Sequence, residues 1–130
     1  HGEEKFHLFN QATVVAITSR WEEPSPLVAR ETAQIGRPAV AAVTGGIPDL
    51  VLDGQTGVLF ERDNPDALAA ALLDLLLTPA KANELGRNAA LHAKRAFGME
   101  RYAREHDELY RALMAARTNN EPSSVSFHAK

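Results

Sequence analysis

The sequence predicts an α/β domain in which a short parallel sheet lies between two layers of helices, with further helices at its C-terminal end. Three observations support this prediction. Short apolar or β-branched runs alternate with helical patterns through the first half of the chain, and glycine- or proline-marked turns separate them. From residue 64 to about residue 113 the apolar periodicity is helical. Strands that alternate with helices favour parallel pairing through crossover connections.

Two kinds of periodicity define the first half. Residues 3–11 have an apolar helical side, and the run A-T-V-V-A-I-T after them is typical of a buried parallel strand. The next helix is bounded by Ser25 as N-cap, Pro26 at its first position and Gly36 after its end. The expected elements are a helix over 3–11, a strand over 12–18, a helix over 26–35, a strand over 39–43, a short helix over 47–52 and a strand over 57–60.

Helical spacing dominates the second half. Asn64-Pro65 begins one helix, and Thr78-Pro79 begins a second that runs to about residue 97, with Gly86 as an interior weak point. Apolar and aromatic residues predict a last helix over about 99–113. The final residues carry no period, so we expect the domain to cover residues 1–116 and a disordered tail to cover 117–130.

The composition is typical of a soluble globular domain. Of 130 residues, 45% are hydrophobic and 24% charged, which is enough apolar material for one core. A net charge of −3 without a Lys/Arg cluster gives no sign of a nucleic-acid partner. The absence of cysteine excludes disulfides and a thiolate nucleophile, and it fits the cytoplasmic location that we expect. No apolar run is long enough to cross a membrane, and no secretory signal is visible.

The strongest functional signal lies in residues 21–43. This segment holds a strand exit, a capped helix start and the glutamates Glu23 and Glu31 with seven residues between them. In doubly wound sheets ligands bind at the carboxyl ends of the strands. A helix that begins there offers free backbone N–H groups to a phosphate, and a carboxylate deeper in the helix suits a ribose or sugar diol. We therefore expect a nucleotide-sugar site.

The order of the following motifs strengthens this interpretation. T-G-G-I-P-D, which contains Gly45-Gly46, comes next, and D-G-Q-T-G-V-L-F follows from Asp53. Together with residues 21–43 these runs resemble the group 1 (family 4) glycosyltransferases of GT-B fold, over roughly residues 1–113. The resemblance implies that the chain is the C-terminal portion of a Rossmann-like donor-binding domain. It also implies a whole enzyme that transfers a sugar, a hexose by expectation, from a nucleotide-diphosphate donor with retention of anomeric configuration.

The resemblance implies a role for each candidate site residue. Glu23 takes the catalytic position near the transferred sugar, and Glu31 binds the ribose hydroxyls. The N–H groups of Ser25, Leu27 and Val28 bind the donor phosphates and sugar. Alternatively, Glu23 is an ordinary loop acid, and Glu31 is a solvated helix residue paired with Arg30 or Arg37.

Two neighbouring features leave the details open. Gly45 and Gly46 are a possible loop contribution to phosphate binding, although two adjacent glycines favour a turn that needs positive φ or close backbone packing. Ser25 stands where these enzymes often carry Phe, and Gln34-Ile35 replaces a common Ala-Cys pair. Either departure is expected to alter donor preference.

The resemblance also defines cofactors and partners. No metal is needed, because the helix dipole and basic side chains offset the charge of the leaving diphosphate. In the family, a basic pair and an N-terminal acceptor-binding domain come from upstream sequence. The chain begins His1-Gly2, so we expect a piece of a longer protein that binds nucleotide weakly and is inactive alone. Any membrane association would be peripheral and would come from parts outside this chain.

The sequence leaves two rival functions to compare with this interpretation. In the first, the chain is a non-catalytic Rossmann-like domain that binds a nucleotide or packs its helices beyond Pro65 on a partner protein. In the second it is a dinucleotide-dependent oxidoreductase domain, which the sequence disfavours because no G-x-G-x-x-G follows a strand. A hydrolase triad is not supported, since Ser19 and Ser25 have no nearby His and Asp partners.

Overall fold

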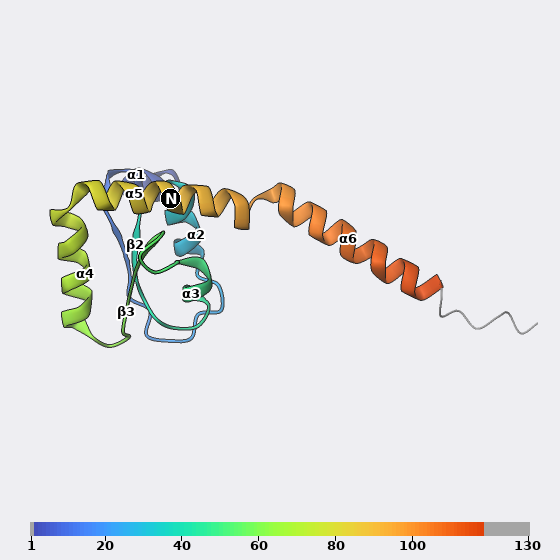
Figure 1. Ribbon diagram of the computed structural model, residues 1–130, viewed down its shortest axis with the longest axis horizontal. Helices are drawn as coiled ribbons and strands as arrows, with labels where there is room; N and C mark the ends of the chain where they lie inside the picture. The colour runs from blue at the N-terminus through green and yellow to red at the C-terminus, as the bar shows by residue number, and fades with distance from the viewer. Residues whose placement is uncertain (1, 119–130) are drawn as a thin grey trace, which may run out of the picture. The chain divides into compact units, whose positions relative to one another are not determined.

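The computed structural model describes residues 2–118 (Figure 1). Residues up to Phe97 form one compact unit, and residues from Gly98 form a second. In chain order the elements are α1 (Gly2–Gln11), β1 (Val15–Ile17), α2 (Leu27–Gln34), β2 (Ala39–Ala42), α3 (Ile47–Leu50), β3 (Gly57–Phe60), α4 (Pro65–Leu77), α5 (Pro79–Ala96) and α6 (Met99–Thr118).

The three strands form one parallel sheet in the order β1-β2-β3. Val15 is opposite Ala39, and Ala39 is opposite Gly57, so the three strands end at the same edge of the sheet. The predicted parallel α/β sheet is confirmed. The first strand is shorter than expected, because the Ala12 N–H still bonds to the carbonyls of Leu8 and Phe9 and so closes the last turn of α1.

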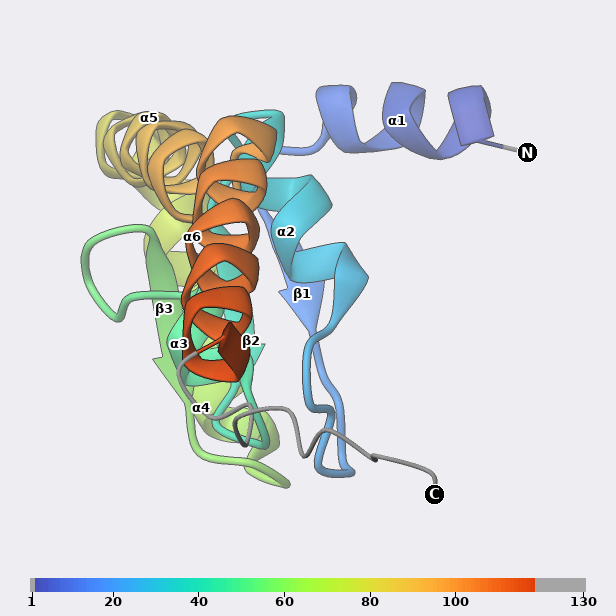
Figure 2. The same ribbon diagram turned by 90° about the vertical axis from the view of Figure 1, so that its right-hand side faces the viewer.

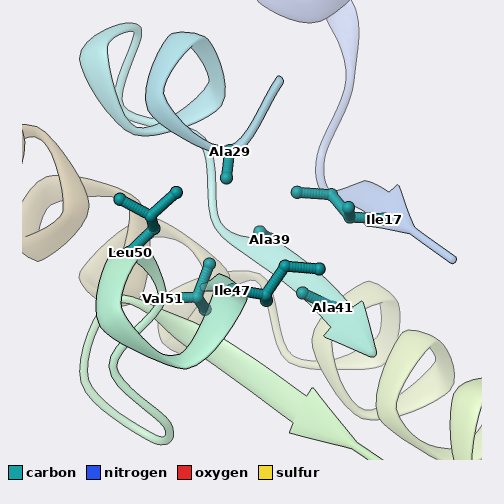
Figure 3. Packing of buried hydrophobic residues seen from close by; sticks show 7 residues of the cluster. All are labelled: Ile17, Ala29, Ala39, Ala41, Ile47, Leu50 and Val51. Carbon is teal, nitrogen blue, oxygen red and sulfur yellow. The ribbon is translucent and has the colours of Figure 1, made fainter. Parts of the chain in front are cut away.

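Alternate residues of β2 face two separate helix layers, as expected for successive residues of a strand. Ala39 and Ala41 face a cluster built by β1, α2 and α3, in which Ile47 of α3 is fully buried (Figure 3). Val40 and Ala42 face a second cluster with β3, α4 and α5, in which Leu75 is fully buried. Figure 1 shows α4 on the opposite side of the sheet from α2 and α3. The predicted three-layer arrangement is therefore confirmed.

A close approach between the end of α2 and the middle of α5 joins the two layers. Gly36 has a φ of 71°, and its N–H and that of Arg37 bond to the carbonyls of Ala33 and Thr32, which is the Schellman motif. A Cβ on Gly86 would lie only 2.2 Å from the carbonyl oxygen of Gly36. The interior glycine of α5 is therefore a packing contact, and the helix continues through it unbroken.

The start of α2 differs from the sequence prediction. The N-cap is Pro26, in extended conformation, and α2 begins at Leu27. The prediction that Ser25 caps the helix is wrong. Its hydroxyl oxygen instead accepts a hydrogen bond from Arg30, which competes with the helix amides for the same acceptor.

The second unit contains α6, which carries the ion pairs Arg101–Glu105 and Arg111–Asp107 at i,i+4 spacing. The helix continues to Thr118, two residues into the segment expected to be a disordered tail. Residues 119–130 lie outside the described part of the chain, so that part of the prediction is untested. Among residues 2–118, no helix combines the length and the apolar character needed to cross a membrane.

Candidate functional site

Two of the three predicted phosphate-binding amides, those of Leu27 and Val28, lie in the first turn of α2, whereas the amide of Ser25 precedes the N-cap Pro26. Leu27 and Val28 are the first two residues of the helix, so their N–H groups have no carbonyl four residues earlier within it. The Ala29 N–H bonds to the carbonyl of Pro26 at 3.2 Å. Leu27 is 64% exposed, and Val28 packs on the cluster around Ile47. The turn therefore has one side anchored in the core and the other side open.

Hydrogen bonds hold the backbone of Glu23 in place, but its side chain is not held in this way. Its N–H bonds to the carbonyl of Trp21 at 2.9 Å, and its own carbonyl accepts from the N–H of Gly46 at 2.8 Å. The Oε2 atom of Glu23 is buried and has no hydrogen-bond partner among residues 2–118. A buried carboxylate oxygen without a partner is rare in proteins, because its desolvation is not compensated.

Gly45 and Gly46 pack tightly against the loop that carries Glu23. Gly45 has a φ of 51°, and a Cβ there would lie 2.2 Å from the Glu23 carbonyl oxygen. A Cβ on Gly46 would lie 2.1 Å from the carbonyl oxygen of Pro24. Both glycines are therefore required by close backbone packing, which is the explanation that the sequence favoured. Their contribution to phosphate binding stays a prediction.

Glu31, on the second turn of α2, is paired with a residue that the sequence did not suggest. Its Oε1 lies 2.6 Å from Nζ of Lys5 on α1, and its side chain is only 16% exposed. The alternative in which Glu31 pairs with Arg30 or Arg37 is therefore wrong. Arg30 donates to Ser25 and lies over the ring of Phe97, and Arg37 donates to the carbonyl of Asn10 on α1. Figure 2 shows α1 above α2.

A polar network joins the exits of all three strands. Glu22 accepts from the Gly45 N–H at 2.6 Å and from Nη1 of Arg62 at 2.8 Å. Nη1 of Arg62 also lies 3.4 Å from Oγ1 of the buried Thr44, which donates to the carbonyl of Trp21. The Gly45 amide and then Arg62 lower the pKa of Glu22. The sequence gave no reason to separate Glu22 from ordinary loop acids, because its partners lie 23 and 40 positions away.

Comparison with known proteins identifies the family. The model of the family "Glycosyl transferases group 1" matches residues 2–92. The chain belongs to the group 1 glycosyltransferases.

The D-inositol 3-phosphate glycosyltransferase of Streptomyces avermitilis is 36% identical over 115 residues, which cover 88% of this chain and 25% of the relative. The corresponding protein of Corynebacterium diphtheriae is 41% identical over 91 residues, which cover 70% of the chain and 21% of the relative. The chain thus spans about a quarter of the length of these curated relatives.

Solved structures of glycosyltransferases share the fold. Sucrose-phosphate synthase from Thermosynechococcus elongatus matches with a TM-score of 0.78 and 35% identity, over 84% of this chain and 27% of that protein. HepE from Anabaena in complex with UDP matches with a TM-score of 0.78 and 28% identity, over 81% of this chain and 29% of HepE. A complex of HepE with UDP-glucose matches with a TM-score of 0.75. The predicted family and its GT-B type of fold are confirmed.

A cavity of about 310 Å³ lies at the same edge of this group 1 glycosyltransferase domain, on the side of α4. Arg20 and Asp63 form an ion pair of 2.6 Å at its rim. Its lining contains none of the predicted donor-binding residues; it consists of Thr18, Ser19, Arg20, Ala42, Phe60, Asp63, Asn64, Pro65 and Leu68. In the part of the chain that the structure describes, no cluster of three or more His, Asp or Glu side chains is placed to bind a metal ion.

Proposed function

We propose that this chain is the C-terminal portion of the donor-binding domain of a retaining glycosyltransferase. The donor is a nucleotide-diphosphate sugar, bound at the carboxyl edge of the sheet. Glu23 lies against the transferred sugar, Glu31 binds the ribose, and the amides of Ser25, Leu27 and Val28 bind the diphosphate. The acceptor is held by another domain of the longer protein, which is cytoplasmic, and the chain alone does not turn over.

The unpartnered Oε2 of Glu23 is the observation that carries this proposal. Leaving a buried carboxylate oxygen without a donor costs about 1–3 kcal/mol or more. The neighbouring carboxylate of Glu22 is exposed and yet has two partners within 2.8 Å. A sugar hydroxyl is a donor of the right size and chemistry to supply the missing hydrogen bond to Glu23. The loop geometry thus supports a sugar at this position.

Glu31 supports the ribose half of the proposal. Its carboxylate is mostly buried, and only one of its oxygens is paired with Lys5. A carboxylate can accept from two hydroxyls at once, which matches the vicinal diol of a ribose. The N–H groups of Leu27 and Val28 lie about one turn before Glu31, at the end of α2 where the helix dipole favours the negative diphosphate without a metal ion.

The nucleotide is proposed from the solved structures. HepE was solved with UDP and with UDP-glucose, and it is 28% identical to this chain over the matched region. UDP is therefore the first nucleotide to test. Because Glu31 contacts ribose and not the base, other nucleoside diphosphates are the natural comparison.

Calorimetric titration of the 130-residue chain with UDP and UDP-glucose, with and without a chelator, tests the proposal. We expect weak binding that the chelator leaves unchanged. The Glu31→Ala change should reduce the affinity about tenfold or more, because it removes a bidentate, charge-assisted contact. Glu84→Ala, which removes an exposed glutamate on α5, is the matched control and should bind like the wild type. Absence of heat with every nucleoside diphosphate would refute the donor site.

One observation favours the alternative of a protein-interaction domain. Within α6, Tyr102, Leu109 and Leu113 are more than half exposed and recur at helical spacing. An apolar helix face of this kind is typical of a surface that packs on another protein. On this alternative, Glu31→Ala leaves self-association or partner binding unchanged, whereas Leu109→Asp abolishes it. Sedimentation of both variants separates the two functions.

A further inference from the structure

The loops after β1, β2 and β3 are joined by a group of four residues that we call the exit clamp: Glu22, Thr44, Gly45 and Arg62. Each loop contributes at least one of them. Glu22 holds the Gly45 N–H with one carboxylate oxygen and Nη1 of Arg62 with the other, at 2.6 and 2.8 Å. The two contacts use separate oxygens, so the side chain is fixed at both ends of its carboxylate.

The exit clamp reaches the proposed donor site through the backbone. Gly45 is followed by Gly46, whose N–H bonds to the carbonyl of Glu23 at 2.8 Å. Thr44, before Gly45, donates to the carbonyl of Trp21 at 3.0 Å. Residues 44–46 are therefore hydrogen-bonded to three successive residues, 21, 22 and 23. A Cβ on Gly45 would clash with the backbone of Glu23, and a Cβ on Gly46 would clash with that of Pro24. The position of the Glu23 backbone depends on where this turn is held.

Arg62 is the cation that keeps Glu22 in place. Glu22 is 70% exposed, so without a partner its carboxylate would be free to turn into solvent. The neighbouring Arg20 is paired with Asp63 at 2.6 Å. Asp63, at a φ of 61°, also has its Oδ2 4.0 Å from Nε of Arg62. The guanidinium of Arg62 is thus held between two carboxylates and aimed at the turn.

We infer that Arg62 is a positioning residue of the donor site: by pairing with Glu22 it fixes the turn at Gly45 and Gly46, and that turn sets the backbone of Glu23. This inference rests on the proposed function. Arg62 acts on the sugar-binding loop through Glu22 and the turn, without a contact of its own to the sugar. Its effect therefore differs from that of the ribose carboxylate, which contacts the donor directly.

Arg62→Met in the 130-residue chain tests the inference with two readouts. The first is the hydrogen exchange of the Gly45 and Gly46 amides, with the amides of β2 as internal reference for folding. The second is the affinity for UDP-glucose relative to UDP. We expect faster exchange at both glycines and about fivefold weaker binding of UDP-glucose, as for the loss of one charge-assisted hydrogen bond, with little change for UDP. Arg62→Lys, which keeps the positive charge, should restore part of the exchange protection at the two glycines and part of the affinity for UDP-glucose.

Lys81→Met is the matched control, because it removes a cation from another exposed ion pair of the same unit, with Asp74 at 2.6 Å. It should change neither readout. Unchanged exchange at Gly45 and Gly46 in Arg62→Met overturns the inference, as does equal weakening by Lys81→Met. If the wild type binds neither nucleotide, the donor proposal fails, and the exchange result still decides whether Arg62 holds the turn. If Arg62→Met exposes the β2 amides as well, Arg62→Lys and Glu22→Gln replace it.

Discussion

Lys5 of α1 and Glu31 of α2 form an ion pair, with Nζ and Oε1 2.6 Å apart, across 26 positions of the chain. It is the most buried of the glutamate ion pairs that the structure places within residues 2–118, since Glu31 is only 16% exposed. The carboxylate proposed to bind ribose thus already has a cationic partner inside the protein. Donor binding has to share that carboxylate with Lys5 or replace it.

The Lys5→Met change tests this competition. Removing the ammonium frees both oxygens of Glu31 for the ribose, so we expect UDP to bind about twofold to fivefold more tightly. The same change leaves a poorly solvated carboxylate unpaired and should lower the free energy of unfolding by about 1 kcal/mol. Calorimetry and urea unfolding measure the two effects. Weaker UDP binding in Lys5→Met would show instead that the ammonium contacts the donor itself.

Features of the fold that depend on local sequence patterns, or on the order of the motifs, could be predicted from the sequence. The parallel sheet, the helix order and the Schellman end at Gly36 all follow from periodicity or from a single residue's backbone preference. It did not predict the exit clamp or the Lys5–Glu31 pair, because each joins residues far apart in sequence. The predicted cap at Ser25 is wrong for a different, local reason: Arg30, five residues later, donates to its hydroxyl.

The Gly46→Ala change tests the effect of close packing at this glycine without any effect of backbone conformation. Gly46 has a φ of −85°, which any residue adopts, so the cost of alanine there is purely steric. Its Cβ would lie 2.1 Å from the Pro24 carbonyl oxygen and would displace the loop that carries Glu23. We expect UDP-glucose affinity to fall about fivefold or more, with a destabilisation of about 1–3 kcal/mol.

Gly54→Ala is the contrasting control. Gly54 has a φ of 66° but nothing within 4 Å of an added Cβ. It should cost about 1–2 kcal/mol of stability through backbone strain and leave UDP-glucose binding unchanged. If both variants lose binding equally, the contact between Gly46 and Pro24 has no specific role in the site.

Gly86→Ala tests the contact between α5 and α2. A helix interior normally gains about 1 kcal/mol when alanine replaces glycine. Here the added Cβ would lie 2.2 Å from the Gly36 carbonyl oxygen, so we expect a net loss of about 1–3 kcal/mol in the free energy of unfolding. Thermal or urea unfolding measures it, with the exposed Arg87→Ala as control. If Gly86→Ala raised the free energy of unfolding, α5 and the end of α2 would be able to move apart without loss of stability.

The Glu22 carboxylate makes the exit clamp sensitive to acid. The Gly45 amide and Arg62 hold its pKa below that of a free glutamate. A group with a lowered native pKa stabilises the fold above its ordinary pKa, and that contribution is lost as the pH falls through the native value. The Gly45 amide resonance should therefore titrate with a midpoint below the usual glutamate range. Because Arg62 is one of the causes, the midpoint should rise in Arg62→Met but stay below the ordinary value, since the Gly45 amide still bonds to Glu22. An NMR titration of both proteins measures this, and a wild-type midpoint at the ordinary value would contradict the Glu22–Gly45 contact.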